Sequence, residues 1–244
     1  MEICSVVTGA AGGMGRAITS ALVDAGHRVV GLDLDAPGLE ALVAAHGEDA
    51  VGTRVVDLTD AEAVAAAFRE IGAETQGLNG LVNNAGTCLM GEFPRIDPDE
   101  LDNQLAINFK SAFYCSQAAV PLMLESAGLR RIVNISSNGA YNFDVFDPPH
   151  YRASKAALDT LTKDLARRYA PHRIRVNSIA PAMTETPLFD VLDETTLRAA
   201  LAQMPTGEAM RPEQIAAWVA FLMSPAGDVA SGNVIVLNQG RDVR

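Results

Sequence analysis

The sequence predicts an α/β fold in which a doubly wound parallel sheet of about seven strands carries helices on both faces. Short apolar runs alternate with helical patterns along the whole chain, and several runs are apolar on both faces, as in strands covered from both sides. The expected strands are residues 3–7, 28–32, 51–56, 80–83, 131–135, 173–179 and 233–237. The 244 residues contain no linker, repeat or low-complexity stretch, so residues 1–244 are expected to form a single domain.

The helices are expected between these runs, with recognisable start and stop signals. Thr59-Asp60-Ala61-Glu62 has the pattern of a capping box, and Pro171 ends another helical pattern. The expected helices are residues 16–25, 60–71, 100–125, 151–170 and 212–223. The Pro- and Thr-rich residues 181–203 are the least regular interior part, and a substrate-loop insertion around residues 187–210 is a candidate mobile lid.

Composition excludes several classes of function. The net charge of −11, without any Lys/Arg-rich run, argues against nucleic-acid binding. No window of 18 apolar residues free of charge is present, and the first strand follows Met1 almost at once, so we expect neither a membrane span nor a targeting segment. The histidines show no metal-ligand spacing, so no metal is expected. The three cysteines, widely spaced and without a CxxC pair, indicate reduced thiols and a cytoplasmic protein: Cys4, Cys88 and Cys115.

The segment TGAAGGMG, Thr8 to Gly15, is the most informative motif. It stands between an apolar run and an amphipathic stretch, which is the order strand, glycine turn, helix. Glycines let the backbone turn tightly and approach a diphosphate, and the first helical turn then presents its N–H groups to the anion. Asp33 follows Gly15 by 18 residues, at the end of the second apolar run, where an acid can accept both hydroxyls of an adenosine ribose.

A second constellation carries the chemistry. Tyr151 and Lys155 are four residues apart, so they share one face of a predicted helix. A tyrosine acts as acid or base near neutrality only if its pKa falls by roughly 3 units, which a nearby ammonium and a cationic nicotinamide ring would favour. Ser136 and Ser137 directly follow an apolar strand, at the sheet edge where ligands bind in open parallel sheets. A serine there can hydrogen-bond a substrate oxygen as charge develops on it.

These residues resemble the short-chain dehydrogenase/reductase family, and the resemblance covers essentially the whole chain. It lies with the short single-domain branch, which has a Rossmann-type fold, because the turn reads TGxxxGxG. The matching motifs are Thr8, Gly9, Gly13 and Gly15 in the turn, NNAG at Asn83 to Gly86, Asn108, the trio Ser137, Tyr151 and Lys155, and VNSIAP at Val176 to Pro181.

The resemblance implies a role for each matching position. Tyr151 would be the general acid/base, Lys155 would lower its pKa and bind the nicotinamide ribose, and Ser137 would orient the substrate oxygen. Asn108 would hold a water that links Lys155 to solvent. Besides Tyr151 and Lys155, the implied cofactor-binding residues are Gly9, Gly13, Met14, Gly15, Asp33, Asp57, Asn84, Ala85, Gly86, Pro181, Thr184 and Thr186.

Some positions depart from the family pattern or leave alternatives open. Ser137 precedes Tyr151 by 14 residues, one more than the family leads us to expect, so Ser136 remains a minor candidate and residues 138–150 form a slightly long loop. Ala182 and Thr184 replace a glycine and a branched aliphatic residue, and Asn238-Gln239-Gly240 replaces an acidic-glycine ending. The alternatives to a cofactor role are a helix cap for Asp57 and a loop threonine for Thr186.

Two further residues have ordinary structural interpretations. His150 adjoins Tyr151 and is interpreted as a loop histidine, with a substrate contact as the alternative. Trp218 is expected in the core or at an interface.

The sequence therefore predicts an NAD-dependent oxidoreductase that interconverts a secondary alcohol and a ketone. The alternatives are a regulatory protein that binds NAD(H) without turnover, and an isomerase or dehydratase on the same fold. The substrate stays open among a sterol, a cyclic alcohol, a polyol and a 3-oxoacyl compound. A homotetramer is expected, partly from the resemblance and partly from an apolar run in one long helix: Ala118, Ala119, Val120, Leu122 and Met123.

Overall fold

The computed structural model describes residues 3–75, 77–142, 147–186, 189 and 193–242. Its centre is one parallel sheet of seven strands in the order β3-β2-β1-β4-β5-β6-β7. The strands are β1 (Ile3–Thr8), β2 (His27–Asp33), β3 (Val51–Val55), β4 (Gly80–Asn83), β5 (Arg130–Ile135), β6 (Ile174–Pro181) and β7 (Val234–Leu237). All seven predicted strands are confirmed, and the predicted doubly wound α/β fold with them.

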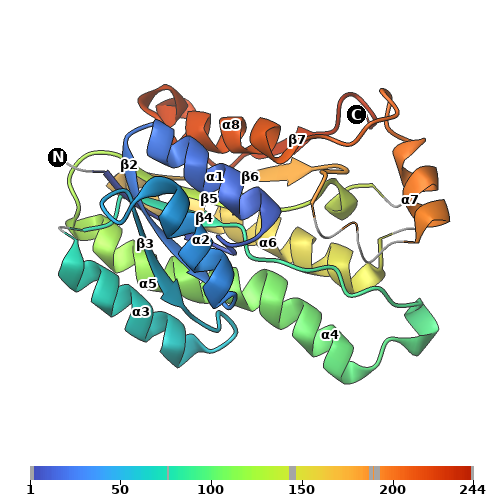
Figure 1. Cartoon of the computed structure of the whole chain (residues 1–244), viewed down its shortest axis with the longest axis horizontal. Helices are drawn as coiled ribbons and strands as arrows, with labels where there is room; N and C mark the ends of the chain where they lie inside the picture. Colours follow the sequence, from blue (N-terminus) through green and yellow to red (C-terminus); the bar gives the residue numbers. More distant parts are fainter. Residues whose placement is uncertain (1–2, 76, 143–146, 187–188, 190–192, 243–244) are drawn as a thin grey trace.

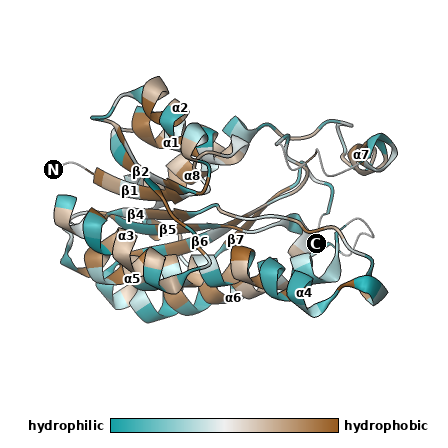
Figure 2. Ribbon diagram, turned by 60° about the horizontal axis from the view of Figure 1, so that its bottom comes forward, coloured by the Kyte–Doolittle hydropathy of each residue, from teal (hydrophilic) through white to brown (hydrophobic). Residues whose placement is uncertain are grey.

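Helices cover both faces of this sheet (Figures 1 and 2). One face carries α1 (Gly13–Asp24), α2 (Ala36–His46) and α8 (Pro212–Met223), and the other carries α3 (Ala61–Glu74), α5 (Ser111–Glu125) and α6 (Pro149–Tyr169). Each face has its own apolar core, and Ile18, Leu22 and Val219 lie in one while Phe68, Cys115 and Met123 lie in the other. Burial on both faces explains why several strands read as continuous apolar runs.

The remaining helices lie beyond the carboxyl ends of the strands. α4 (Pro98–Leu105) and α7 (Glu194–Leu201) are at the same end of the molecule in both ribbon views (Figures 1 and 2). Short helical turns complete the described elements: η1 (Phe93–Arg95), η2 (Ala106–Lys110), η3 (Asn138–Ala140), η4 (Ala170–His172) and η6 (Pro225–Val229). None of the helices in the described residues is long and apolar enough to span a bilayer.

The start of α3 differs from the predicted capping box. Asp60, not Thr59, is the N-cap, and its carboxylate accepts hydrogen bonds from the N–H groups of Glu62 and Ala63. The Thr59 hydroxyl donates instead to Asp57, at 2.7 Å. A carboxylate offers more acceptor sites than a hydroxyl, so the neighbouring Asp takes the cap.

The predicted long helix at residues 100–125 is interrupted. α4 begins at Pro98, with the Asp97 carboxylate accepting from the N–H of Glu100, and the π-helical turn η2 separates it from α5. The wider helical turn directs Asn108 toward the interior, where its side chain is fully buried. Apolar periodicity does not reveal one extra residue in a turn, and such turns occur frequently at functional sites.

Two helices were not among those predicted. α2 begins after Asp35, whose carboxylate accepts from the N–H of Gly38. α7 lies inside the candidate lid, begins after the cap Asp193 and buries Ala200. Residues 181–203 are therefore less irregular than expected, and β6 already includes Pro181. Residues 187–188 and 190–192 of the candidate lid lie outside the described residues.

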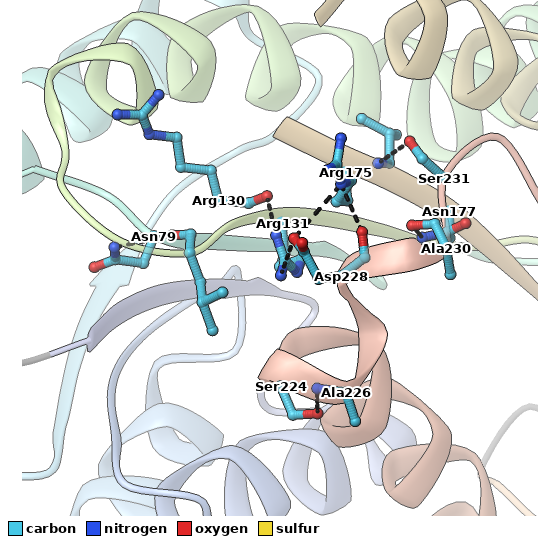
Figure 3. Close-up of polar contacts among 12 residues, drawn as sticks. Asn79, Arg130, Arg131, Arg175, Asn177, Ser224, Ala226, Asp228, Ala230 and Ser231 are labelled. Carbon is cyan, nitrogen blue, oxygen red and sulfur yellow. Dashed lines mark hydrogen bonds and ion pairs between the residues drawn. The ribbon is translucent and has the colours of Figure 1, made fainter. Parts of the chain in front are cut away.

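An ion-pair cluster ties η6 to the amino ends of β5 and β6, far from the carboxyl ends of the strands (Figure 3). The Arg131 side chain is 2% exposed, and its Nη2 lies 3.0 Å from Asp228 Oδ1. Arg175 Nε donates to the main-chain oxygen of the same Asp228 at 2.7 Å. Because a buried guanidinium needs a partner, Asp228 fixes the chain before β7.

Candidate active site

The candidate site lies where the strand order reverses. β1 pairs with β2 on one side and with β4 on the other, so the connections after β1 and β4 leave in opposite directions. The crevice at the carboxyl ends of such a pair is where open α/β sheets bind ligands. The glycine turn follows β1, the NNAG segment ends β4, and Ser136 and Ser137 follow β5.

The glycine turn has no room for a side chain at Gly9 or Gly15. Gly9 has a φ of 63°, and a Cβ on Gly15 would lie 2.0 Å from Gly9 O. The N-cap of α1 is Gly12, and no side chain caps this helix end. The first N–H groups of α1 therefore face outward with the positive end of the helix, and this arrangement fits the diphosphate of a dinucleotide.

Asp33 ends β2 beside this turn. Its Oδ2 accepts from the N–H of Ala11 at 2.9 Å, and its Oδ1 accepts from the N–H of Leu34 at 2.7 Å. These bonds fix the carboxylate at the rim of the glycine turn, as recognition of a ribose requires. The Asp57 side chain lies at the next strand end, where hydrogen bonds from Thr59 lower its pKa. Asp57 is held by this local turn and does not cap α3.

The NNAG segment joins the glycine turn to the predicted catalytic residues. Asn84 Nδ2 donates to the main-chain oxygens of Thr8 and Gly9, at 3.0 and 3.1 Å. The N–H of Ala85 donates to Thr8 Oγ1 at 3.0 Å. A Cβ on Gly86 would lie 3.1 Å from Lys155 Nζ and 3.3 Å from Asn108 Oδ1, so this position must stay small.

The structure brings the predicted catalytic residues together. Tyr151 and Lys155 lie in the first turns of α6, and Ser137 lines the same cavity as Tyr151, near enough to lower the pKa of its hydroxyl. Lys155 is buried, and its Nζ donates to Ile135 O at 2.9 Å. Asn108 Nδ2 donates to Ser154 Oγ at 3.0 Å, which links the π-helical turn to α6.

The two candidate serines have different partners. Ser136 Oγ donates to the main-chain oxygen of Lys155 at 3.3 Å and is buried. Ser137 Oγ accepts from the N–H of Gly139 at 3.0 Å and also reaches Tyr151. Contact with the Tyr151 hydroxyl favours Ser137 as the serine that holds a substrate oxygen.

Burial dominates the ionisation of both reactive groups. Burial raises the pKa of Tyr151 well above its usual range; the Ser137 hydrogen bond lowers it, and the charges of Asp147 and Cys88 raise it further. Burial lowers the pKa of Lys155 to about 8, although the charge of Asp159 raises it. We expected Lys155 to lower the pKa of Tyr151; in this structure the lowering contribution comes from Ser137, and Lys155 Nζ is bonded to Ile135 O.

A cavity of about 150 Å³ lies in front of these residues. Tyr151, Ser137 and Asp147 contribute polar groups to it. Pro181 lines it from the end of β6, Thr184 and Thr186 from the chain that follows, and Met14 from the glycine turn. The resemblance implies cofactor binding at these four positions. Thr184 also forms a parallel bridge with Met210, which closes the base of the candidate lid.

His150 and Trp218 lie away from the cavity lining. His150 is buried with Nε2 3.3 Å from Glu100 Oε1, and it does not line this cavity. Trp218 is 42% exposed and packs edge-on against Phe221 on α8. Trp218 is therefore a surface residue in this chain, not a core residue.

Sequence reasoning missed three acidic residues around the site. Asp147 lines the cavity from the loop before α6. Asp159 is buried and accepts from the hydroxyls of Tyr141 and Ser178, at 2.7 and 2.6 Å. Asp242, near the C-terminus, accepts from Asn138 Nδ2 at 2.7 Å. The slightly long segment at residues 138–150 was expected to shape the pocket, but no local pattern pointed to any of these three acidic residues.

The fold and the site define a class of protein: a dinucleotide-binding domain with a half-buried tyrosine and a buried lysine beside the crevice. Residues 9–242 match the family profile described as Enoyl-(Acyl carrier protein) reductase. The chain is 32% identical to 3-oxoacyl-(acyl-carrier-protein) reductase FabG of Thermotoga maritima over 98% of this chain and 97% of that protein. It is 35% identical to D-threitol dehydrogenase of Mycolicibacterium smegmatis, over 98% of this chain and 93% of that protein.

A solved structure supports the same assignment. The chain is similar to a Pseudomonas aeruginosa structure titled as an RhlG/NADP active-site complex, with a TM-score of 0.90, 30% identity and coverage of 98% of this chain and 96% of that one. The chain belongs to the short-chain dehydrogenase/reductase family of oxidoreductases.

Proposed function

We propose that this protein, acting as one domain over residues 1–244, interconverts a secondary alcohol and a ketone with NAD(H). One observation carries the proposal: Ser137 and Tyr151 line the same cavity, with the buried Lys155 one helical turn from Tyr151, at the sheet edge that also holds the glycine turn. A protein that only binds a dinucleotide has no use for this arrangement.

The chain's own residues would transfer the proton. Ser137 would donate to the substrate oxygen, and Tyr151 would take the hydroxyl proton in oxidation and return it in reduction. A bound nicotinamide would accept or deliver the hydride and, when oxidised, add a positive charge near Tyr151. Since burial raises the pKa of Tyr151, we propose that the phenolate forms only beside that positive charge. Lys155 would hold the nicotinamide ribose, and Asn108 would complete the proton path to solvent.

The test removes one heavy atom, the hydroxyl oxygen of Tyr151. Tyr151→Phe keeps the ring but removes the hydroxyl, so we expect turnover to fall by at least about 100-fold while NADH affinity changes less than about twofold. Tyr169→Phe, at the other end of α6, is the matched control and should keep full activity. More than a few per cent of activity in Tyr151→Phe would contradict the acid/base role. A regulatory protein would bind NADH without any turnover, and an isomerase or dehydratase would convert its substrate without net NADH change.

The cofactor proposal is NAD(H) rather than NADP(H). The Asp33 carboxylate, held by the Ala11 N–H, would face a 2′-phosphate at short range and repel it. Arg16 lies just after the turn and its Nε donates to Ala11 O at 2.6 Å, so it is the cation that would offset this repulsion. The similar RhlG structure is titled with NADP. We expect higher kcat/KM with NADH than with NADPH and a smaller difference in Asp33→Ala; equal or better use of NADPH by the native protein would refute the proposal.

We also propose a homotetramer. The apolar run that predicted an interface from the sequence cannot form one, because Ala119, Val120 and Met123 are buried in the chain's own core. Two other faces expose large apolar side chains, one on α4 and α5 and one on α8 and β7. These side chains are Leu101, Phe113 and Leu124, and Trp218, Phe221 and Val236. Two such faces would give a dimer of dimers, and light scattering that shows a monomer at micromolar concentration would overturn it.

The cytoplasm is the proposed compartment. Cys4, Cys88 and Cys115 are all buried. Reduced thiols suit a reducing compartment, and burial raises the pKa of Cys88 and of Cys115 to about 12, which keeps both unreactive. Fluorescence of a tagged chain in its own cells would test the compartment.

A further inference from the structure

We propose that Asp147 makes this site selective for vicinal diols, by accepting a hydrogen bond from the hydroxyl on the carbon next to the reacting one. This inference rests on the proposed function and names its substrate class. In reduction the same contact would select α-hydroxyketones. Such a substrate is a small polyol rather than a sterol, a simple cyclic alcohol or a 3-oxoacyl compound.

The position of Asp147 places its carboxylate beside the reacting groups. Asp147 lines the cavity together with Ser137 and Tyr151. A Cβ on Gly139 would lie 2.3 Å from Asp147 Oδ2 and 3.2 Å from Ser137 Oγ. Both oxygens therefore border the same small volume, which only a glycine at position 139 leaves free.

The charge of Asp147 changes the pKa of two other residues that line the cavity. It raises the pKa of Tyr151 and the pKa of Cys88, and all three residues line the same cavity. Among the described residues, none donates a hydrogen bond to this carboxylate. Arg152 Nε donates instead to the main-chain oxygen of Asp147, at 3.0 Å. Burial raises the pKa of Asp147 itself, and the Arg152 charge opposes this. A half-buried acceptor without a donor is suited to a donor on the ligand.

The rest of the cavity wall explains why the donor must be next to the reacting carbon. Beyond the polar groups the lining is largely apolar, with Met90, Met183 and Phe189. When Ser137 holds the reacting oxygen, a substituent on the adjacent carbon would lie within reach of Asp147, because Ser137 Oγ and Asp147 Oδ2 border the same volume beside Gly139. A hydroxyl there satisfies the carboxylate, a methyl leaves it desolvated and unpaired, and a carboxylate or phosphate is repelled.

The test compares substrates that differ only in that substituent. The probes are the 2,3-butanediol stereoisomers, 3-methyl-2-butanol, in which a methyl replaces one hydroxyl, and 3-amino-2-butanol, in which an ammonium does. NADH formation gives kcat/KM for each. In the native protein we expect the best diol isomer to exceed 3-methyl-2-butanol by roughly 10- to 100-fold, the range expected for a hydrogen bond to a charged group.

Variants then assign that preference to Asp147. Asp147→Asn keeps the shape and removes the charge, so the diol preference should fall by about tenfold or more while 3-methyl-2-butanol changes less than about threefold. Gly139→Ala pushes the carboxylate aside without removing it and should also lower the preference. The double variant should lose no more preference than Asp147→Asn alone. Glu92→Gln, which removes an exposed charge from the neighbouring outer groove, is the control and should leave the preference unchanged.

Each outcome separates the inference from the proposed function. If no alcohol is oxidised, the reaction class fails. If the native protein oxidises diol and methyl analogue equally well, or Asp147→Asn slows both equally, the reaction class stands and the inference is overturned. A preference for the amino alcohol would also overturn it, because Asp147 would then select a cation.

Discussion

Lys155→Met is expected to make the protein more stable while abolishing its activity. Lys155 is 5% exposed, and burial lowers its pKa from 10.5 to about 8. A fall of this size corresponds to about 3 kcal/mol against the charged form in the folded state. Methionine fills a similar volume without the charge, so at pH 7 Lys155→Met should raise the free energy of unfolding by about 1–3 kcal/mol. The upper value neglects the hydrogen bond from Lys155 Nζ to Ile135 O, which the substitution removes.

The sign of this effect depends on pH in a defined way. Between pH 8 and 10.5 the unfolded chain keeps the Lys155 proton that the folded chain has lost, so stability of the native protein rises with pH in this window. The advantage of Lys155→Met should therefore shrink from about 3 kcal/mol at most at pH 7 to about 1 kcal/mol at pH 10.

The assay is urea unfolding at pH 7, 8, 9 and 10 for the native protein, Lys155→Met and Lys163→Met. Lys163 lies two turns further along α6 and is exposed, so its substitution should change stability little and without this pH dependence. Lower stability of Lys155→Met at pH 7, or an advantage that does not vary with pH, would refute the reasoning that burial opposes the charge.

Three further outcomes are expected. Gly15→Ala should lower the free energy of unfolding in urea by at least about 1–3 kcal/mol, because its Cβ would lie 2.0 Å from the carbonyl oxygen of Gly9. In the control Gly12→Ala the Cβ would lie 3.5 Å from the same oxygen, so the free energy of unfolding should change by less than about 1 kcal/mol. Equal effects of the two substitutions would contradict this reasoning. Asp228→Ala should cost about 2–3 kcal/mol, below the 3–5 kcal/mol of a fully buried pair because Asp228 is 47% exposed; a neutral substitution would show that Arg131 finds another partner. Amide exchange across residues 187–210 should be fast in the free protein and slow in a ternary complex with a dead-end inhibitor, and unchanged exchange would indicate a preformed pocket.

Local patterns in the sequence were sufficient to predict the strands and to identify the main motifs. A strand buried on both faces must be apolar along its length, so all seven strands are readable from short windows. The glycine turn and the spacing of Tyr151 and Lys155 are also local, because a turn and an i,i+4 pair involve only near neighbours in the chain. The seven strands follow from that information, whereas the meeting of Ser137 with Tyr151 was expected from the resemblance to the family.

Other features depend on contacts between residues far apart in the sequence, and the tertiary structure decided them. The π-helical turn at Asn108 inserts one residue without changing the apolar pattern. Val120 and Met123 read equally well as core or interface, and only the packing of α5 on the sheet buries them. Asp147 gives no local signal of its role, because its carboxylate meets Gly139 and joins the cavity lining only in the folded chain. The sequence by itself thus determined the fold and the reacting groups, whereas the shape and charge of the substrate pocket were decided by tertiary structure, since loop closure sets which distant side chains share one small volume.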